Sequence, residues 1–404
     1  MAARLRVLVL TSTFPRWPGD REPAFVFELC RRLAASHEVL VLAPHCRGAA
    51  REERLGEGLT VRRFRYAPER LESLAYDGGI LEKLRRSPWR YLLVPLFLFG
   101  ELWAALRAVR AMRPDVIHAH WMVPQGIVGR IAALAGPGPK RPALVCTSHG
   151  ADLFALRGVL ARSLKSWVAR HADALTVVST AMTLPAVQLG ARAENVRVMP
   201  MGVDARSRFS PAPIPRRAER ELLFVGRLVA KKGVNHLPQV LALVQRSLPG
   251  MQLTVVGAGP LEPELRAEAR ARGVEEQMVF AGAVPNDELP PYYRRATALV
   301  VPSIVTRDGD QEGLGLVIGE ALACECPVVA SALPAIRDLI QDGVTGLLAR
   351  AADPGDFAEK ILALVQDPLR AAELARRGRR LVLQQLDWHS VGRRYDELLT
   401  AAAE

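Results

Sequence analysis

The sequence predicts an α/β protein made of two Rossmann-like domains. Three observations support this fold class: strand and helix signals alternate along the whole chain, a polar Pro-rich segment interrupts them near the middle, and a new apolar strand begins directly after it. At 404 residues the chain is long for one hydrophobic core and sufficient for two. Such sheets bind ligands beyond the carboxyl ends of their strands, which is where functional residues are expected.

The first series of elements begins with an apolar strand at residues 6–10 and a helix at 24–35. Further strands are expected at 38–43, 59–66, 115–119, 143–147, 174–179 and 195–199. The most apolar stretch, residues 91–106, is interrupted by Pro95, Gly100 and Glu101. It therefore predicts a buried or interfacial helix in preference to a membrane-spanning one.

A polar segment containing Pro211, Pro213 and Pro215 separates the two series and is interpreted as an interdomain linker. The second series has expected strands at 221–225, 251–257, 278–281, 298–301, 328–331 and 346–349. We therefore predict an N-terminal domain at 1–204, a C-terminal domain at 205–385 and a final amphipathic helix at 386–404.

The segment from Glu312 to Glu320 reads as a turn followed by an apolar helix. Gly313 and Gly315 leave backbone N–H groups free to approach an anion at the start of that helix. Glu320 follows Glu312 by about two helical turns, so both carboxylates are expected to project from one element. Glu pairs at this spacing are more often solvated, but the two glycines and the buried strand expected at 328–331 favour a binding site.

Cations follow the first strand of the second series. Arg227, Lys231 and Lys232 come just after the strand at 221–225, at the edge where ligands bind in such folds. An Arg fork and a Lys point charge together match a diphosphate, although an Arg and a Lys after a strand are more often solvated. The turn at Gly257 and Gly259 is a weaker signal, because a tight strand-to-helix connection explains it equally well.

Three histidines stand at strand ends in the first series: His118, His120 and His149. A single strand-end histidine is more often structural than catalytic. We expect His118 and His120 to face opposite sides of their strand, which argues against a joint metal site.

These motifs resemble those of a known family. The pattern E-G-x-G-x-x-x-x-E from Glu312 to Glu320, with P-V-V-A-S after it, is similar to the E-x7-E signature of retaining GT-B glycosyltransferases of family 4. The run V-G-R-L-x-x-x-K-G at 225–233 matches the same family. The resemblance implies that Glu312 contacts hydroxyls of a donor sugar and that Glu320 holds the ribose. It also implies that Arg227 and Lys232 grip the diphosphate, with Lys231 a solvated neighbour.

The resemblance extends to weaker signals. It implies that the Gly257–Gly259 turn and the main chain near Val284 line the nucleotide, and that His149, favoured over His120 and His118, lies near the transferred sugar. The remaining donor-site residues implied by the signature are Gly313, Leu314 and Gly315. It also implies a cleft between the two domains and a C-terminal helix packed on the first of them. Two departures are visible: Glu325 replaces a usual glycine, which we interpret as local C-cap variation, and only Gly19 stands where a Gly-Gly pair is usual.

The activity implied by the resemblance is retaining, metal-independent transfer from a UDP- or GDP-sugar to a glycan or lipid-linked acceptor in surface polysaccharide or glycolipid synthesis. No cofactor and no metal are expected. Asp308 and Asp310 have Asp-x-Asp spacing but stand in a polar loop before Glu312. Two alternatives remain open: a nucleotide-sugar-binding subunit without transfer activity, and a GT-B-type sugar-nucleotide epimerase.

Charge and cysteine content suggest where the protein works. Residues 1–200 carry 29 Lys/Arg against 16 Asp/Glu, so the whole excess of positive charge in a chain of net charge +12 lies in its first half. Nucleic acid is ranked last as a partner, because the cations are not interleaved with aromatic residues. Lys83, Arg85, Arg86 and Arg90 stand with Trp89 just before the apolar helix. This arrangement suits peripheral contact with an anionic membrane, although a helix simply packed on the sheet explains it as well.

The five cysteines lie mostly in apolar runs, which indicates buried thiols in a reducing compartment. The first strand follows the N-terminus too closely for a secretory signal. We therefore expect a cytoplasmic protein, peripheral on the inner face of the plasma membrane if the membrane contact is real.

Overall fold

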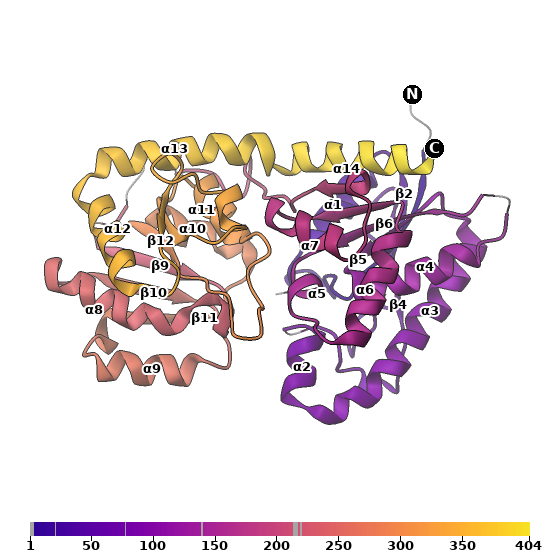
Figure 1. Cartoon of the computed structure of the whole chain (residues 1–404), viewed down its shortest axis with the longest axis horizontal. Coiled ribbons are helices and arrows are strands. Elements are labelled where there is room, and N and C mark those ends of the chain that lie inside the picture. The colour runs from indigo at the N-terminus through magenta and orange to yellow at the C-terminus, as the bar shows by residue number, and fades with distance from the viewer. Residues whose placement is uncertain (1–3, 21, 77, 139, 213–216, 219) are drawn as a thin grey trace. The chain divides into compact units, whose positions relative to one another are not determined.

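A computed structural model describes residues 4–20, 22–76, 78–138, 140–212, 217–218 and 220–404. The chain forms two compact units (Figure 1). The N-terminal unit contains Met1–Val178, Met182–Met199 and Val391–Glu404; the C-terminal unit contains Ser179–Ala181 and Pro200–Ser390. The change between units falls at Met199–Pro200, and the last helix divides at Val391.

The N-terminal unit is built on an eight-stranded sheet in the order β3-β4-β2-β1-β5-β6-β7-β8. Its strands are β1 (Arg6–Leu10), β2 (Glu38–Pro44), β3 (Glu52–Arg54), β4 (Leu59–Phe64), β5 (Val116–His120), β6 (Ala143–Ser148), β7 (Ala174–Val177) and β8 (Val196–Val198). All neighbours are parallel except β3, which pairs antiparallel with β4. The strand signals predicted the other seven, but Glu-Glu-Arg in β3 has no apolar alternation and was missed.

The first strand shows why this sheet forms. Val7, Leu8, Val9 and Leu10 are all fully buried, so both faces of β1 are covered. A continuous apolar run of this kind is typical of a parallel strand between two helical layers. Helices of this unit are α1 (Phe25–Leu33), α2 (Ile80–Arg86), α3 (Leu93–Met112), α4 (Ile127–Leu134), α5 (Ala151–Phe154), α6 (Val159–His171) and α7 (Thr183–Gln188).

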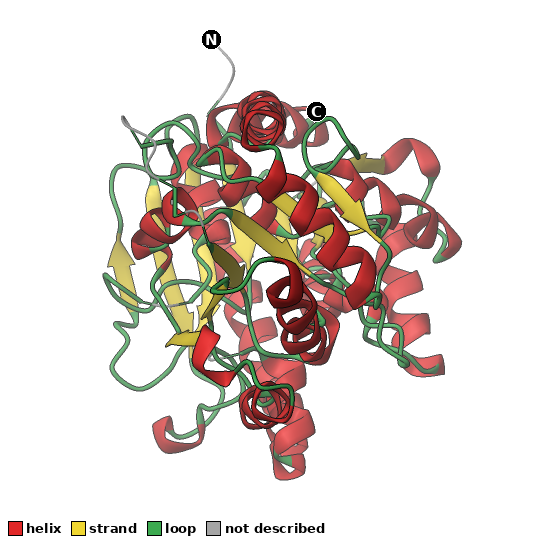
Figure 2. Cartoon of the chain, turned by 90° about the vertical axis from the view of Figure 1, so that its left-hand side faces the viewer, coloured by secondary structure: helices red, strands yellow, loops and turns green. Residues whose placement is uncertain are grey.

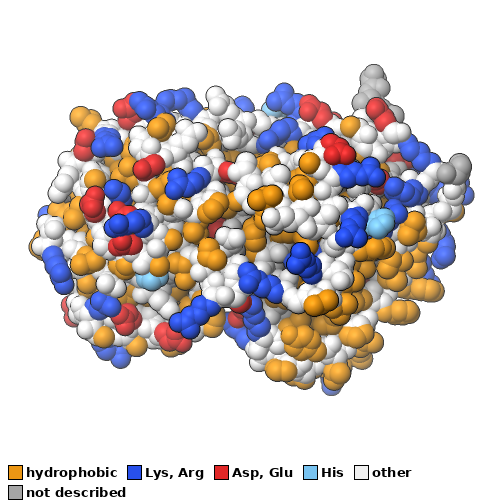
Figure 3. All heavy atoms as spheres, in the orientation of Figure 1, with side chains coloured by type: hydrophobic (Ala, Val, Ile, Leu, Met, Phe, Trp, Pro, Cys, Tyr) orange, Lys and Arg blue, Asp and Glu red, His pale blue; other side chains and the backbone are white. Residues whose placement is uncertain are grey.

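The apolar helix expected at 91–106 is α3, which runs unbroken to Met112. Pro95 does not interrupt it, because Pro95 stands in the first turn, where no intrahelical bond to its nitrogen is needed. Glu101 lies on the inner side of the helix and is fully buried. None of the described residues covers the outer side, where Phe99 and Trp103 are exposed, and hydrophobic side chains gather over α2 and α3 in Figure 3.

The C-terminal unit has a six-stranded, wholly parallel sheet in the order β11-β10-β9-β12-β13-β14. Its strands are β9 (Glu221–Val225), β10 (Gln252–Val256), β11 (Met278–Gly282), β12 (Ala298–Val301), β13 (Val328–Ser331) and β14 (Leu347–Ala349). Its helices are α8 (Leu237–Ser247), α9 (Glu262–Ala271), α10 (Pro290–Arg295), α11 (Leu316–Ala323), α12 (Pro354–Gln366) and α13 (Pro368–Gln385), and α14 (Trp388–Ala403) begins in it. Helices cover both faces of the strands (Figure 2).

Both sheets reverse their strand order beside their first strand, between β1 and β5 in one and between β9 and β12 in the other. Such switch points open a crevice at the carboxyl ends of the strands, where ligands bind. The predicted α/β class and Rossmann-like topology are confirmed by these strand orders.

The described residues of the expected linker are packed on the C-terminal unit. Phe209 is 2% exposed, and its ring centroid lies 6.0 Å from that of Tyr293. Arg217 donates a hydrogen bond to the carbonyl of Ala296 at 3.0 Å. Pro213 and Pro215 lie outside the described residues.

Two smaller expectations are also settled by the structure. Glu325 follows α11 with φ of +56°, so the chain does adopt a left-handed C-terminal turn there, as the C-cap interpretation required. All five cysteines are free and buried, in agreement with the prediction of core thiols.

Candidate functional site

The switch point of the C-terminal sheet brings together the cations after β9 and the first glutamate of the signature after β12. Nζ of Lys232 lies 2.5 Å from Oε2 of Glu312, and their side chains are 15% and 13% exposed. The two residues are 80 positions apart in sequence. The pair exists because β9 and β12 are neighbours in the sheet and their loops leave at the same edge.

Gly233 explains how the lysine loop comes so close to β12. Its φ is +65°, and a Cβ at this position would lie 1.7 Å from the carbonyl oxygen of Pro302. Any other residue would push the loop away from the end of β12. The glycine therefore places Lys232 beside Glu312.

Glu312 is held in its charged form. Burial alone would raise its pKa, but the charges of Lys232 and Lys231 outweigh burial and keep the pKa below its ordinary value. Arg227, which is exposed after β9, acts in the same direction. The site thus holds a carboxylate surrounded by cations, an arrangement able to bind hydroxyls and phosphates together.

Lys231 is not the solvated neighbour that was expected. Its Nζ lies 3.1 Å from Oδ1 of Asp310, and the two side chains are only 12% and 16% exposed. The prediction failed because the loop before Glu312 folds back over the lysines, a contact that no local pattern reports. Asp310 is thereby engaged with a cation.

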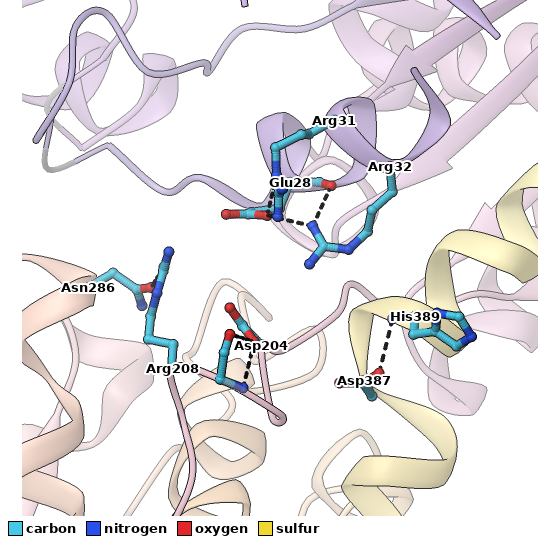
Figure 4. A network of polar contacts seen from close by, with 9 residues as sticks. Glu28, Arg31, Arg32, Asp204, Arg208, Asn286, Asp387 and His389 are labelled. Carbon is cyan, nitrogen blue, oxygen red and sulfur yellow. Dashed lines mark hydrogen bonds and ion pairs between the residues drawn. The ribbon is translucent and has the colours of Figure 1, made fainter. Parts of the chain in front are cut away.

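Glu320 sits in α11 and is buried. Its Oε1 accepts a hydrogen bond from Nδ2 of Asn286 at 3.0 Å, and its Oε2 accepts one from the hydroxyl of Tyr293 at 2.8 Å. Burial raises the pKa of Glu320 to about 7, even though both hydrogen bonds act to lower it. Nη1 of Arg208 donates to Oδ1 of Asn286 at 2.9 Å and so fixes the amide (Figure 4).

The prediction that the two glutamates, Glu312 and Glu320, project from one element is wrong. α11 begins only at Leu316, and Gly315 is its N-cap with φ of +84°. Glu312 therefore belongs to the preceding turn, together with the buried residues Gly313 and Leu314. The sequence predicted too early a start for this helix, because the first three residues after Glu312 form the glycine turn and not the helix.

The second glycine turn has a packing role. A Cβ on Gly257 would lie 1.9 Å from the carbonyl oxygen of Gly226, and one on Gly259 would lie 2.4 Å from that of Leu228. The turn after β10 thus lies directly against the turn that carries Arg227. Val284 is half-buried in the loop after β11, one strand farther from the switch point.

In the N-terminal unit, the histidines gather at the carboxyl ends of β5 and β6. Nδ1 of His120 and Nε2 of His149 are 3.0 Å apart, a hydrogen bond in which one ring donates to the other. The His149 ring also packs against Phe25 and Trp121, with ring centroids 4.9 and 4.8 Å away. Burial lowers the pKa of His149 to about 3, so the ring is neutral near pH 7.

The prediction that His118 and His120 face opposite sides of β5 is wrong. Their ring centroids are 4.3 Å apart. Side chains alternate along a strand, so residues two apart lie on the same face. Nε2 of His118 hydrogen bonds to Oγ1 of Thr147 at 2.8 Å, and burial lowers its pKa to about 3.

Asp152 supports the backbone around His149. Its Oδ1 accepts the His149 N–H at 3.2 Å and the Ser148 hydroxyl at 2.9 Å, while its Oδ2 accepts the Met122 N–H at 2.8 Å. Its position three residues after His149 is a short-range signal that sequence reasoning could have used. Asn286 and Tyr293 lack such a signal, since they reach Glu320 from 34 and 27 residues away.

Comparison with known proteins identifies both halves of the chain. Residues 24–207 match the family model described as Glycosyltransferase Family 4, and residues 208–381 match Glycosyl transferases group 1. A GDP-mannose-dependent alpha-(1-6)-phosphatidylinositol monomannoside mannosyltransferase of Mycolicibacterium smegmatis is 30% identical over 98% of this chain and 99% of its own length. A D-inositol 3-phosphate glycosyltransferase of Acidothermus cellulolyticus is 32% identical over 87% of this chain and 79% of its own.

Solved structures share the fold. Sucrose-phosphate synthase from Thermosynechococcus elongatus superposes with a TM-score of 0.79 at 22% identity, covering 98% of each chain. HepE of Anabaena, solved in complex with UDP and glucose, gives a TM-score of 0.73 at 19% identity, covering 98% of this chain and 100% of its own.

Proposed function

Because the chain belongs to the group 1, family 4 glycosyltransferases and has their GT-B fold, we propose that it moves a hexose, with retention of anomeric configuration, from a nucleoside-diphosphate sugar to a glycan or lipid-linked acceptor. The observation that carries the proposal is the Lys232–Glu312 pair at the switch point of the C-terminal sheet. A cation and a carboxylate in contact there match the two chemistries of a sugar nucleotide, its diphosphate and its hydroxyls.

In this proposal the C-terminal unit binds the donor. Lys232 and Arg227 hold the diphosphate, and Glu312 accepts hydrogen bonds from sugar hydroxyls. Glu320 accepts from the ribose, since each of its oxygens keeps a lone pair beyond those used by Asn286 and Tyr293. The turns at Gly257, Gly259, Gly313, Leu314 and Gly315 and the main chain at Val284 complete the nucleotide site.

We further propose that transfer needs no metal ion. The departing diphosphate carries negative charge that Arg227 and Lys232 stabilise directly, as a metal does in other transferases. The pairing of Asp310 with Lys231 supports this, because that carboxylate is already neutralised by a protein cation. Asp308 and Asp310 are thus not assigned as ligands.

On the N-terminal unit, His149 is the residue we assign to the transferred sugar. Its low pKa makes it a neutral hydrogen-bonding group, suited to a sugar hydroxyl and unsuited to act as a cationic acid. His120 orients it through the 3.0 Å ring-to-ring hydrogen bond.

We also propose that the acceptor is lipid-linked and that the protein works in the cytoplasm, at the inner face of the plasma membrane. The Mycolicibacterium relative is named for a phosphatidylinositol monomannoside substrate. In this chain, Lys83, Arg85 and Arg86 lie in α2, and Arg90 lies beside Trp89 just before α3. Cations next to exposed aromatic residues are suited to an anionic membrane surface.

Turnover of UDP- and GDP-sugars by the full chain tests the function. Release of free nucleoside diphosphate is measured with and without acceptor, and each measurement is made both in the absence and in the presence of chelator. A transferase releases the diphosphate chiefly with acceptor, and chelator leaves the rate unchanged. A binding subunit releases none, and an epimerase converts the sugar without needing acceptor. If chelator abolishes activity and added Mg²⁺ or Mn²⁺ restores it, Asp308 and Asp310 become candidate metal ligands again.

A further inference from the structure

The outer side of α3 carries an apolar stripe that nothing in the described structure covers. Leu92, Leu96, Phe99 and Trp103 follow one another at helical spacing and are 76%, 47%, 68% and 50% exposed. The inner side packs on the sheet through residues such as Phe97, which is 1% exposed. The patch is visible over α3 in Figure 3.

By length and composition, Pro88–Met112 is apolar enough to cross a membrane, yet only 33% of its apolar 18-residue window is buried in this fold. A core helix of a globular protein would be mostly buried. A spanning helix would not keep its inner side packed on a sheet, with Phe97 centred 5.2 Å from both Phe64 and Tyr66. The helix is therefore half core and half exposed, which is the pattern of an element that lies on an interface.

A groove of about 570 Å³ runs beside the stripe, between α3 and the strand β4 with the residues after it. Its lining on the helix side includes Phe99 and Trp103, and on the other side Arg62 and Arg65. Gly100 brings the two walls together, since a Cβ there would lie 2.5 Å from the carbonyl oxygen of Arg65. The stripe therefore continues into a hollow that has both apolar and cationic walls.

Three guanidinium groups of the groove are anchored by carboxylates. Arg62 pairs with Glu52 at 3.0 Å, Arg63 with Glu53 at 2.5 Å and Arg65 with Glu72 at 2.6 Å. A further groove residue, Arg107, lies with its guanidinium carbon 5.0 Å from the Trp103 ring centroid. No ion pair in the described part of the chain uses Arg107, so the groove has a surplus positive charge beside an aromatic ring.

We propose that this face is seated on an anionic phospholipid bilayer, with the phosphate of one lipid headgroup bound in the groove at Arg107 and its acyl chains against Phe99 and Trp103. Trp103 stacks on Phe99 with rings 13° apart, giving a flat apolar surface that ends in a cation. Aromatic rings beside arginines are suited to the boundary between headgroups and acyl chains.

Charge complementarity favours a bilayer over a second copy of this chain. The stripe lies between Arg90 at one end and Arg107 and Arg110 at the other, so two such faces brought together would repel. An anionic surface instead gains from every one of these cations. This inference rests on the membrane contact proposed above and adds to it the outer side of α3 and the groove beside it.

Co-sedimentation of the full chain with vesicles tests this site, using phosphatidylcholine alone or mixed with phosphatidylglycerol, at low and high salt. We expect binding only to the anionic vesicles and weaker binding at high salt. Phe99→Ser/Trp103→Ser should abolish binding, and Arg107→Ser should weaken it about fivefold, the share of one cation near an anionic leaflet. Leu184→Ser in α7 and Leu369→Ser in α13, at positions 65% and 85% exposed, should bind as the wild type does.

Brominated acyl chains provide a second measurement. They should quench tryptophan emission in the wild type, and the quenched component should fall in Trp103→Phe but not in Trp17→Phe, whose ring is 42% exposed elsewhere. Absence of binding at low salt, or undiminished binding by the Phe99/Trp103 variant, overturns the proposal. A wild-type dimer that this variant converts to monomer would show instead that a second copy covers the stripe.

Nucleotide-sugar turnover with a soluble acceptor is measured on the same variants. In the wild type, intact turnover without binding to anionic vesicles rejects the lipid site alone, and absent turnover rejects the proposed function.

Discussion

At the switch point of the C-terminal sheet, Lys232 and Glu312 face each other as a charged pair, whereas in the N-terminal unit His120 and His149 share a hydrogen bond as neutral rings. Both groups follow the carboxyl ends of parallel strands. What differs is the surrounding charge: the glutamate side chain has cations beside it, whereas the histidine rings lie against each other, against aromatic rings and against the Thr147 hydroxyl. Burial therefore neutralises the histidines but fails to neutralise Glu312.

This difference assigns different chemistry to the two regions. A site that keeps its charges can bind a diphosphate and stabilise it as it departs. A neutral imidazole pair can orient a hydroxyl without competing for the phosphate charge. The two regions should consequently respond differently to pH and to loss of single side chains.

The largest effect is expected from Glu320, through the pH dependence of stability. Its pKa is about 7 in the folded chain against an ordinary value of 4.5, so the folded state binds the proton more tightly. The resulting stability is complete below the ordinary pKa and is lost as pH rises to about 7. Glu320→Gln should remove this loss, on the order of 3 kcal/mol between about pH 5 and about pH 8, in urea unfolding of the full chain.

Glu359→Gln is the matched control, since that side chain is 75% exposed in the same unit. The histidines should show the opposite dependence of stability on pH, because their pKa is lowered whereas that of Glu320 is raised. His118 and His149 have a pKa lowered from 6.5 to about 3, so their contribution to stability is complete above 6.5 and is lost as pH falls towards 3. An unchanged pH slope in Glu320→Gln would mean that this carboxyl is charged throughout.

The second-largest effect is expected from Lys232→Ala, which removes the cation of the Lys232–Glu312 pair. Donor binding and transfer should weaken together, because in the proposed function the ammonium contacts the diphosphate both before and during its departure. Losing a charge-assisted contact costs roughly 1.5–3 kcal/mol, or about ten- to a hundredfold in kcat/KM. Lys360→Ala, on the helix α12 of the same unit, should leave the kinetics unchanged. Wild-type kinetics in Lys232→Ala would remove this residue from the donor site.

His149→Ala should have the smallest effect, since it removes a neutral hydrogen bond worth about 0.5–1.5 kcal/mol, a loss of up to roughly tenfold in kcat/KM. The pH–rate profile of the wild type should show no step at the ordinary histidine value, because burial holds the pKa of His149 at about 3. The exposed His171 provides the control substitution in the same unit. A histidine step near pH 6.5 that disappears in His149→Ala would contradict the neutral assignment.

The sequence by itself determined the parallel sheets and the place of the candidate site at the strand ends of the second one. Strands such as β9, β12 and β13 were predicted at their observed bounds, because a run of buried apolar residues between turns is a local signal. The cations after β9 and the E-G-x-G turn were also local, since glycine and charge at strand ends can be read from adjacent residues. The missed strand β3 has no apolar residue, and therefore gave no such signal.

The tertiary structure alone decided which of these side chains meet. Lys231 and Asp310 are 79 positions apart, and Glu320 receives hydrogen bonds from a different loop and a different helix. Sequence periodicity reports only whether a residue faces inward, whereas a partner is fixed by strand order and by how the loops pack at one sheet edge. The uncovered side of α3 has the same cause: its composition predicted an apolar helix, but only packing on one face of the sheet left Leu92, Phe99 and Trp103 exposed.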